Sequence, residues 1–145
     1  MKDASNYIST ELFTLLNGNL AYDSVNVPVY SITQDVGETA SLFVNLTSSY
    51  ITSEIGTKDA FIRPYSVNLD VVALQANKSE AGVDKIANDI GVLVKPSPSV
   101  FGITGNADFN IINCTVADAR SFQDRSDTMW RIRKVLTIEF IIKQL

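Results

Sequence analysis

The side chains that carry most enzyme chemistry are scarce in this chain. Histidine is absent, which removes the commonest general base and the commonest metal ligand at neutral pH. The single cysteine, Cys114, cannot form an internal disulfide, and without histidine the usual zinc sites cannot be built. Because Cys114 lies in an apolar-leaning stretch, we expect a buried thiol rather than a reactive nucleophile, in a chain that folds in a reducing cytoplasm.

Carboxylates are the remaining candidates for acid–base chemistry. Asp118, Asp124 and Asp127 fall close to a predicted hairpin turn, while Asp84 and Asp89 fall on a predicted helix. Two carboxylates can act as general acid and general base, but charged groups in a turn are more often simply hydrated. The sequence has no glycine-rich phosphate loop, dinucleotide fingerprint or nucleophile elbow. We therefore expect no enzyme activity, no cofactor and no metal.

Cations gather near the C-terminus of a chain that is acidic as a whole. The net charge of −4 argues against tight nucleic-acid binding, because affinity for phosphates comes from Lys and Arg. In one predicted hairpin, five residues are candidates for a protein interface: Arg120, Arg125, Trp130, Arg131 and Arg133. Arg131 and Arg133 share one face of a regular strand, and Trp130 fits either an interface anchor or the core. The alternative is a hydrated hairpin whose charges pair with one another and add little stability.

The last segment, WRIRKVLTIEFIIKQL, has the two-residue period of a strand with one buried face. Apolar side chains recur at alternate positions, namely Trp130, Ile132, Leu136, Ile138, Phe140 and Ile142. Residues 108–122 are predicted to pair with residues 128–144 across a turn at 123–127. One face of the first strand would carry Phe109, Ile111 and Asn113, and the other Ile112, Cys114 and Val116. A strand of ~14 residues spans ~45 Å, so one end of this hairpin should project beyond the core.

Two helices are predicted from apolar residues that recur every three or four positions. The first spans residues 4–16, with Asp3 or Ser5 as its N-cap and Gly18 in its left-handed stop. The second spans residues 77–96. No apolar run approaches the ~18 residues of a membrane-spanning helix, and the N-terminus has no secretory signal, so we expect no membrane contact.

Further strands are predicted upstream of the hairpin, at residues 42–46 and 61–75. A short strand beside Pro28 would lie at an edge or begin at the proline, which has no N–H to donate. Residues 34–40 are a predicted turn and residues 56–59 a predicted loop. Because strands form runs instead of alternating with helices, we expect one domain, residues 1–145, of α+β class. Its mainly antiparallel sheet would be flanked by two helices and end in the long hairpin.

Several short words of sequence occur in a recognisable order. VPVYSI follows the first helix, SLFVNLTSSYI and RPYSVNLDVVALQAN form a central strand pair, GVDKIANDIGVLV is a helix, and WRIRKVLTIEFII is the last strand. This order resembles the tail terminator, or tail completion, proteins of long-tailed bacteriophages. That family has a "vPVY" segment, a strand ending in "v.LDVVA" and a final "R…vl.ieF" pattern. The chain departs from it in SSYITSEIGTKDAFIRPYS, which is longer than the family's compact segment.

The resemblance implies a structural virion protein of the tail and neck, assembled in the host cytoplasm. Such proteins form a ring, usually a hexamer, that caps the tail tube, stops its polymerisation and meets neck proteins. Six copies at −4 each carry about −24, which would let DNA pass through the lumen without specific binding. A rotational ring needs two different patches on each subunit, which the hairpin and the loop at 47–64 could supply.

Two other interpretations remain open. The chain could be another phage ring component, such as a head completion, connector or tail tube protein. It could also be a small cytosolic ligand-binding or enzymatic α+β domain, which predicts a concave pocket with convergent polar groups.

Overall fold

The computed structural model describes residues 2–31, 41–51, 55–57, 60–126 and 128–145. The helices and strands follow in the order α1 (Ser5–Leu16), β1 (Ala21–Tyr22), β2 (Val25–Asn26), β3 (Val29–Tyr30), β4 (Leu42–Ile51), β5 (Ile55–Thr57), β6 (Ala60–Gln75), α2 (Ala81–Val94), β7 (Phe109–Ser126) and β8 (Met129–Gln144). The predicted α+β class is confirmed, with two helices, a mainly antiparallel sheet and a long C-terminal hairpin.

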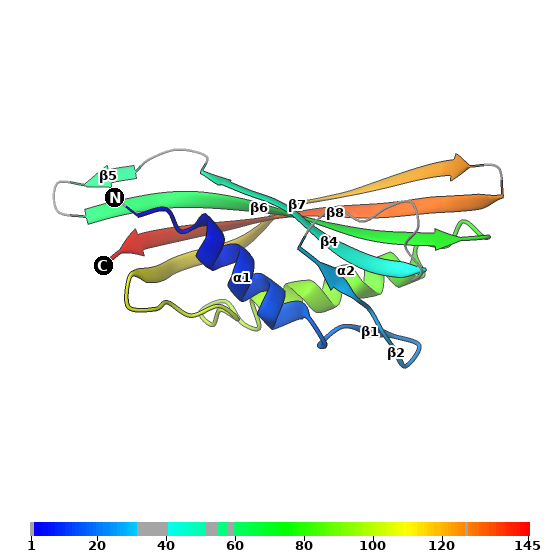
Figure 1. Cartoon of the computed structure of the whole chain (residues 1–145), viewed down its shortest axis with the longest axis horizontal. Coiled ribbons are helices and arrows are strands. Elements are labelled where there is room, and N and C mark those ends of the chain that lie inside the picture. The colour runs from blue at the N-terminus through cyan, green and yellow to red at the C-terminus, as the bar shows by residue number, and fades with distance from the viewer. Residues whose placement is uncertain (1, 32–40, 52–54, 58–59, 127) are drawn as a thin grey trace.

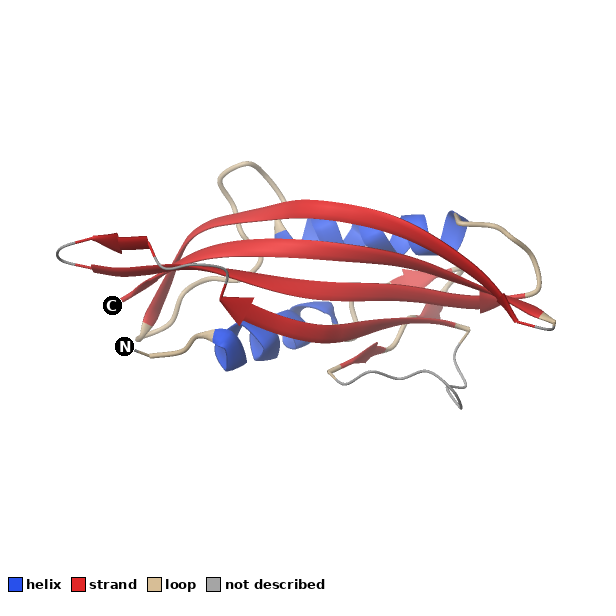
Figure 2. Cartoon of the chain, turned by 90° about the horizontal axis from the view of Figure 1, so that it is seen from above, coloured by secondary structure: helices blue, strands red, loops and turns tan. Residues whose placement is uncertain are grey.

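The main sheet has the strand order β3-β4-β6-β8-β7, with β5 paired to the beginning of β6. Every pairing is antiparallel except β3 with β4. Both helices lie against one face of the sheet, and among the described residues no helix covers the other face, which we call the open face (Figures 1 and 2). The two termini lie at one end of the molecule, and the end of β7 and the beginning of β8 lie at the other, beyond both helices (Figure 1). The predicted projection of the hairpin is therefore confirmed.

Alternation along the two central strands builds the core on the helix side. The buried residues of β6 include Val67, Leu69, Val71 and Ala73, and those of β8 are Ile132, Leu136, Ile138, Phe140 and Ile142. The helices contribute Ile8, Leu12, Leu16, Val83, Ile86, Ile90 and Val94 to the same cluster. Burial of each large aliphatic side chain contributes about 1.5–3 kcal/mol, so these two strands and two helices hold the fold together.

The helix ends differ in detail from the prediction. The N-cap position of α1 is Ala4, and its side chain makes no capping hydrogen bond. The Asp3 carboxylate instead accepts hydrogen bonds from the Ser5 backbone N–H (2.9 Å) and hydroxyl (2.6 Å), and Gly18 takes the expected left-handed conformation. Helix α2 begins at Ala81 rather than residue 77, because residues before it form a turn held by the Gln75 side chain.

The prediction for β7 is wrong in placing Cys114 and Val116 on the face opposite Phe109 and Ile111, although the two do share a face. A β-bulge between Ile111 and Asn113 inserts one residue, which reverses the alternation that follows. Cys114 and Val116 therefore lie on the same side as Ile111, opposite Phe140 and Ile138. Cys114 is buried, whereas Val116 is 39% exposed and Ile112, in the bulge, is 43% exposed. Asn113 is exposed as well.

Two predicted connections are strands. Strand β7 continues to Ser126, so most of the predicted turn at 123–127 is paired backbone. Residues 47–51 and 55–57 of the predicted 47–64 loop belong to β4 and β5. The short strand beside Pro28 is confirmed as the edge strand β3. The predicted turn at 34–40 and the loop residues 58–59 lie outside the described residues.

Candidate interaction surfaces

The projecting tip of the hairpin is built around Trp130, which is half-buried. The Lys78 ammonium and the Arg125 guanidinium lie 5.1 Å and 5.6 Å from the centre of its ring, within the range of cation–π attraction. The Gln123 amide donates a 2.8 Å hydrogen bond to Glu80, just before α2. The tip is therefore tied to the residues just before α2, and it carries carboxylates as well as the cations around the Trp130 ring.

Arg133 is engaged within the protein. Its Nε and Nη2 donate to Oδ2 of Asp70 at 3.0 Å and 2.7 Å. The Asp70 side chain is 8% exposed and that of Arg133 is 32% exposed. This hydrogen bonding raises the pKa of Arg133 against the opposing effect of burial. The guanidinium also lies 5.9 Å from the ring centre of Phe122, so Arg133 joins three neighbouring strands on the open face.

The hairpin register divides the five predicted interface residues between two faces. Arg120, Arg131 and Arg133 share the open face, because residues paired directly across strands point to the same side. Arg125 and Trp130 are paired with each other and point to the helix side. The structure thus brings three of the arginines onto one surface, and it places the other two residues around the tip. Their part in an interface remains a prediction.

The predicted carboxylate cluster does not form a catalytic pair. Asp118 pairs with Thr137, six residues along β7 from Asp124, which corresponds to about 20 Å. Asp127 lies outside the described residues. On α2, Asp84 accepts a 2.9 Å bond from Lys134, and Asp89 pairs with Lys85.

No group of three or more His, Cys, Asp or Glu among the described residues could hold a metal ion. Among the described helices, none has the length and apolarity to cross a membrane.

Cys114 is buried, as predicted. Burial raises the pKa of its thiol to about 11, although the nearby Lys95 charge acts in the opposite direction. The Lys95 ammonium donates a 2.8 Å hydrogen bond to the backbone carbonyl of Cys114 and so ties the end of α2 to β7. The thiol is therefore protonated at neutral pH, where the nucleophilic thiolate is suppressed.

The outer edge of β7 is a surface feature that sequence reasoning missed. Among the described residues, this 18-residue strand pairs only with β8. Its exposed apolar side chains are Ile112, Val116 and Phe122. An uncovered edge of this length offers unpaired backbone groups to another strand. Only the unusual length of the predicted strand signalled it in the sequence.

A groove of about 420 Å³ runs between α2 and the hairpin. Small residues lie along it, including Ala87, Gly91 and Ala119, and the side chains of Lys95 and Lys134 border it. Lys134 is held by Asp84 and Lys95 by a backbone carbonyl. The two lysines that border the groove are therefore already engaged within the protein.

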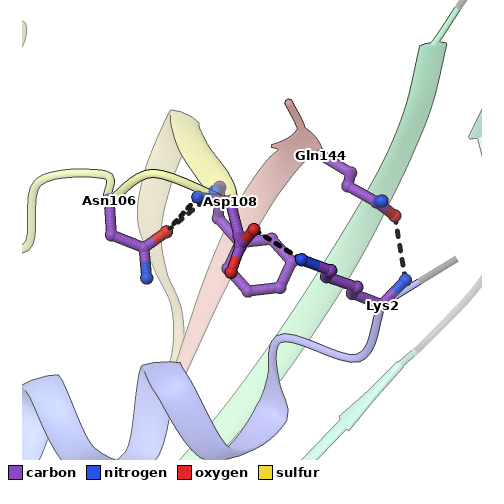
Figure 3. A network of polar contacts seen from close by, with 5 residues as sticks. Lys2, Asn106, Asp108 and Gln144 are labelled. Atoms are coloured by element: carbon purple, nitrogen blue, oxygen red, sulfur yellow. Dashed lines mark hydrogen bonds and ion pairs between the residues drawn. The ribbon is translucent and has the colours of Figure 1, made fainter.

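A polar network joins the two termini at the end of the molecule opposite the hairpin tip (Figure 3). The Lys2 backbone N–H donates to Oε1 of Gln144 at 2.9 Å, and its ammonium pairs with Asp108 at 2.6 Å. Oδ1 of Asn106 accepts from the backbone N–H groups of Asp108 and Phe109, both at 2.8 Å. These contacts join both termini to the loop before β7, so the two ends of the molecule present different chemistry.

Similarity to known proteins is found at the level of structure. The chain matches no protein-family model and no curated protein sequence. Its structure is similar to a chain in the virion of a native gene transfer agent (GTA) particle, with a TM-score of 0.59 at 14% sequence identity. The match covers 97% of this chain and 92% of the other. At this level of identity the likeness shows a shared fold over nearly the full length of both chains.

Proposed function

We propose that this chain is a structural virion protein that forms a ring, a hexamer, on the end of a tail tube and joins the tube to the neck. The observation that carries the proposal is the full-length likeness of its fold to a chain of a virion. The sequence words shared with tail terminator proteins support the more specific role. The described residues add an uncovered strand edge and a hairpin tip that carries Arg125 and Trp130, which suit an assembly subunit better than an enzyme.

The sheet topology supplies two different edges for a ring contact. Three antiparallel pairings separate β4 from β7, so these two strands run in opposite directions. Rotation about an axis roughly parallel to the strands would bring β7 of one copy beside β4 of the next, in antiparallel orientation. Strand β3 covers β4 only at Val44 and Asn45. A contact between two different patches closes into a ring when the rotation closes, and strand addition supplies its backbone hydrogen bonds.

The open face of the sheet would then line the channel. Its charges are largely balanced, as in the Asp70–Arg133 pair, and Thr137 donates a 3.0 Å hydrogen bond to Asn68 in the middle of the face. A balanced polar wall in a ring of negative net charge holds a polyanion weakly. DNA would therefore pass without specific binding.

The hairpin tip would provide the contact with the tube or neck proteins. Arg125 and Trp130 lie at the end of the molecule, where a partner stacked along the ring axis would meet them. Arg120, Arg131 and Arg133 extend this surface along the open face. An aromatic ring beside arginines is a composition that recurs among residues contributing strongly to binding.

Native mass spectrometry and electron microscopy test the proposal, first on the chain alone and then with tail tube protein. We expect rings of fixed size on tube ends, and tubes that no longer elongate. Arg125→Glu should weaken attachment to the tube, whereas Lys85→Glu, an equal change of charge on α2, should not. Unlimited polymerisation of the chain alone would instead identify a tube protein. A particle of 15.9 kDa that stays single with virion partners present would reject the assembly role.

A further inference from the structure

Only part of the uncovered β7 edge is regular. The two irregularities in its pairing with β8 lie between Ile111 and Asn113 and between Val116 and Asp118. From residue 118 to residue 126 the register runs without interruption. Bulges hinder the addition of another strand, so this nine-residue segment is the part of the edge best suited to pairing. Its middle residue is Phe122.

The segment is complementary to itself when it is reversed. Arg120, Phe122 and Asp124 share the open face, since they pair with Val135, Arg133 and Arg131 of β8. All three are exposed, and Phe122 is 46% exposed. In an antiparallel pair of such segments centred on Phe122, Arg120 of each copy lies opposite Asp124 of the other. The two Phe122 rings then lie opposite each other.

We propose that two free copies of this chain form a symmetric dimer by antiparallel pairing of residues 118–126, with the two-fold axis at Phe122. Opposite charges and aromatic pairs directly across strands are stabilising, and like charges there are destabilising. An axis at residue 120 would place Arg120 opposite its own copy, and an axis at residue 124 would do the same for Asp124. Of these three axes, only the one at Phe122 places opposite charges directly across from each other.

This dimer goes beyond the proposed virion function and does not depend on it. It covers the same edge that the proposed ring contact uses, so one copy cannot make both contacts at once. In the free protein the dimer would shield the regular edge from indiscriminate strand pairing. It would have to separate before a ring could close.

Sedimentation equilibrium of charge variants tests the pairing. The wild-type chain should reach twice its mass of 15.9 kDa as concentration rises. Arg120→Asp and Asp124→Arg each create two like-charge contacts across the axis, and each should raise the dimer Kd about tenfold. The double variant R120D/D124R restores opposite charges and should return the Kd to within about threefold of the wild type. Circular dichroism checks that every variant is folded.

Cysteine cross-linking fixes the axis independently. Phe122→Cys places two thiols directly opposite each other, so mild oxidation should yield a disulfide-linked dimer. Ser121→Cys is the matched control, because it faces residue 123 of the other copy and lies ~7–8 Å from its own counterpart. The wild type, with only the buried Cys114, should not cross-link.

The outcomes separate this inference from the proposed function. A monomer at all concentrations, equal cross-linking of both cysteine variants, or no rescue by the double variant would overturn the dimer. Rings formed by the free chain would also overturn it while supporting the virion role. A dimer that never forms rings on tubes would support the inference and remove the proposed function.

Discussion

Breaking the ion pair between Asp70 and Arg133 should affect stability differently according to which partner is removed. Arg133→Met leaves the Asp70 carboxylate, which is 8% exposed, without its cation. Removing one partner of a fully buried pair costs about 3–5 kcal/mol. Arg133 itself is 32% exposed, so the pair is partly hydrated and we expect a loss of about 2–3 kcal/mol.

Asp70→Asn should be milder. The amide oxygen still accepts a hydrogen bond from Arg133, and the guanidinium still reaches water, so the expected loss is about 1–1.5 kcal/mol. For a chain of this size these losses lower Tm by about 6–10 °C for Arg133→Met and about 3–6 °C for Asp70→Asn. The double variant should lose less than the sum of the two, because neither residual partner is then stranded.

Urea unfolding measures these differences, and the single tryptophan, Trp130, provides the fluorescence signal. Circular dichroism provides a second signal from the whole chain. Agreement of the two transitions would support two-state unfolding, which the comparison of free energies requires. An Arg133→Met loss below about 0.5 kcal/mol, or smaller than that of Asp70→Asn, would contradict the reasoning from burial.

Two further predictions concern tight packing and the buried thiol. Gly102→Ala should destabilise by more than about 2 kcal/mol, because the added Cβ would lie 2.0 Å from a backbone carbonyl oxygen. Gly91→Ala, at an open site inside α2, should stabilise by about 0.5–1 kcal/mol, and thermal denaturation compares the two. The Cys114 thiol, with a pKa of about 11, should react slowly with Ellman's reagent at pH 8 in the native protein and quickly in urea. Burial raises this pKa above its ordinary value of 9.0, so the unfolded chain loses the thiol proton at a lower pH than the folded protein does. The contribution of Cys114 to the free energy of unfolding is therefore complete below pH 9 and declines as pH rises toward 11. Cys114→Ala should remove this contribution to the fall of Tm with pH.

The faces of β6 and β8 could be predicted because apolar side chains recur at alternate positions along most of each strand, although Lys134 falls on the core side and Val72 is buried on the open face. The same rule failed on β7, where Ile111 and Ile112 are both isoleucine. Either could be the buried one, so composition does not reveal the bulge between them. Before the bulge the odd-numbered residues of β7 face the core, and directly after it the even-numbered residues do.

The contacts of the interface candidates could not be predicted from the sequence alone, because they depend on how the strands pair. Alternation correctly separated Arg131 and Arg133 from Trp130. The partner of Arg133, however, is Asp70, which lies 63 residues earlier and is brought near by the register of β6 with β8. The sequence pattern marks both residues as facing away from the core, and only the register shows that they meet.

The lengths of the elements explain why this fold leaves surface for partners. Strand β7 has 18 residues, which span about 60 Å, whereas α1 and α2 have 12 and 14 residues and together span about 40 Å. The helices therefore cannot cover the whole sheet even on their own side. A fold optimised for an isolated molecule would shorten the strands to the length that its helices cover, because the extra residues lose conformational entropy and bury little. The extra strand length lies at the hairpin tip and along the β7 edge, where Trp130 lies near Arg125 and Phe122 near Arg133, and this is the surface that we propose for contacts with another chain.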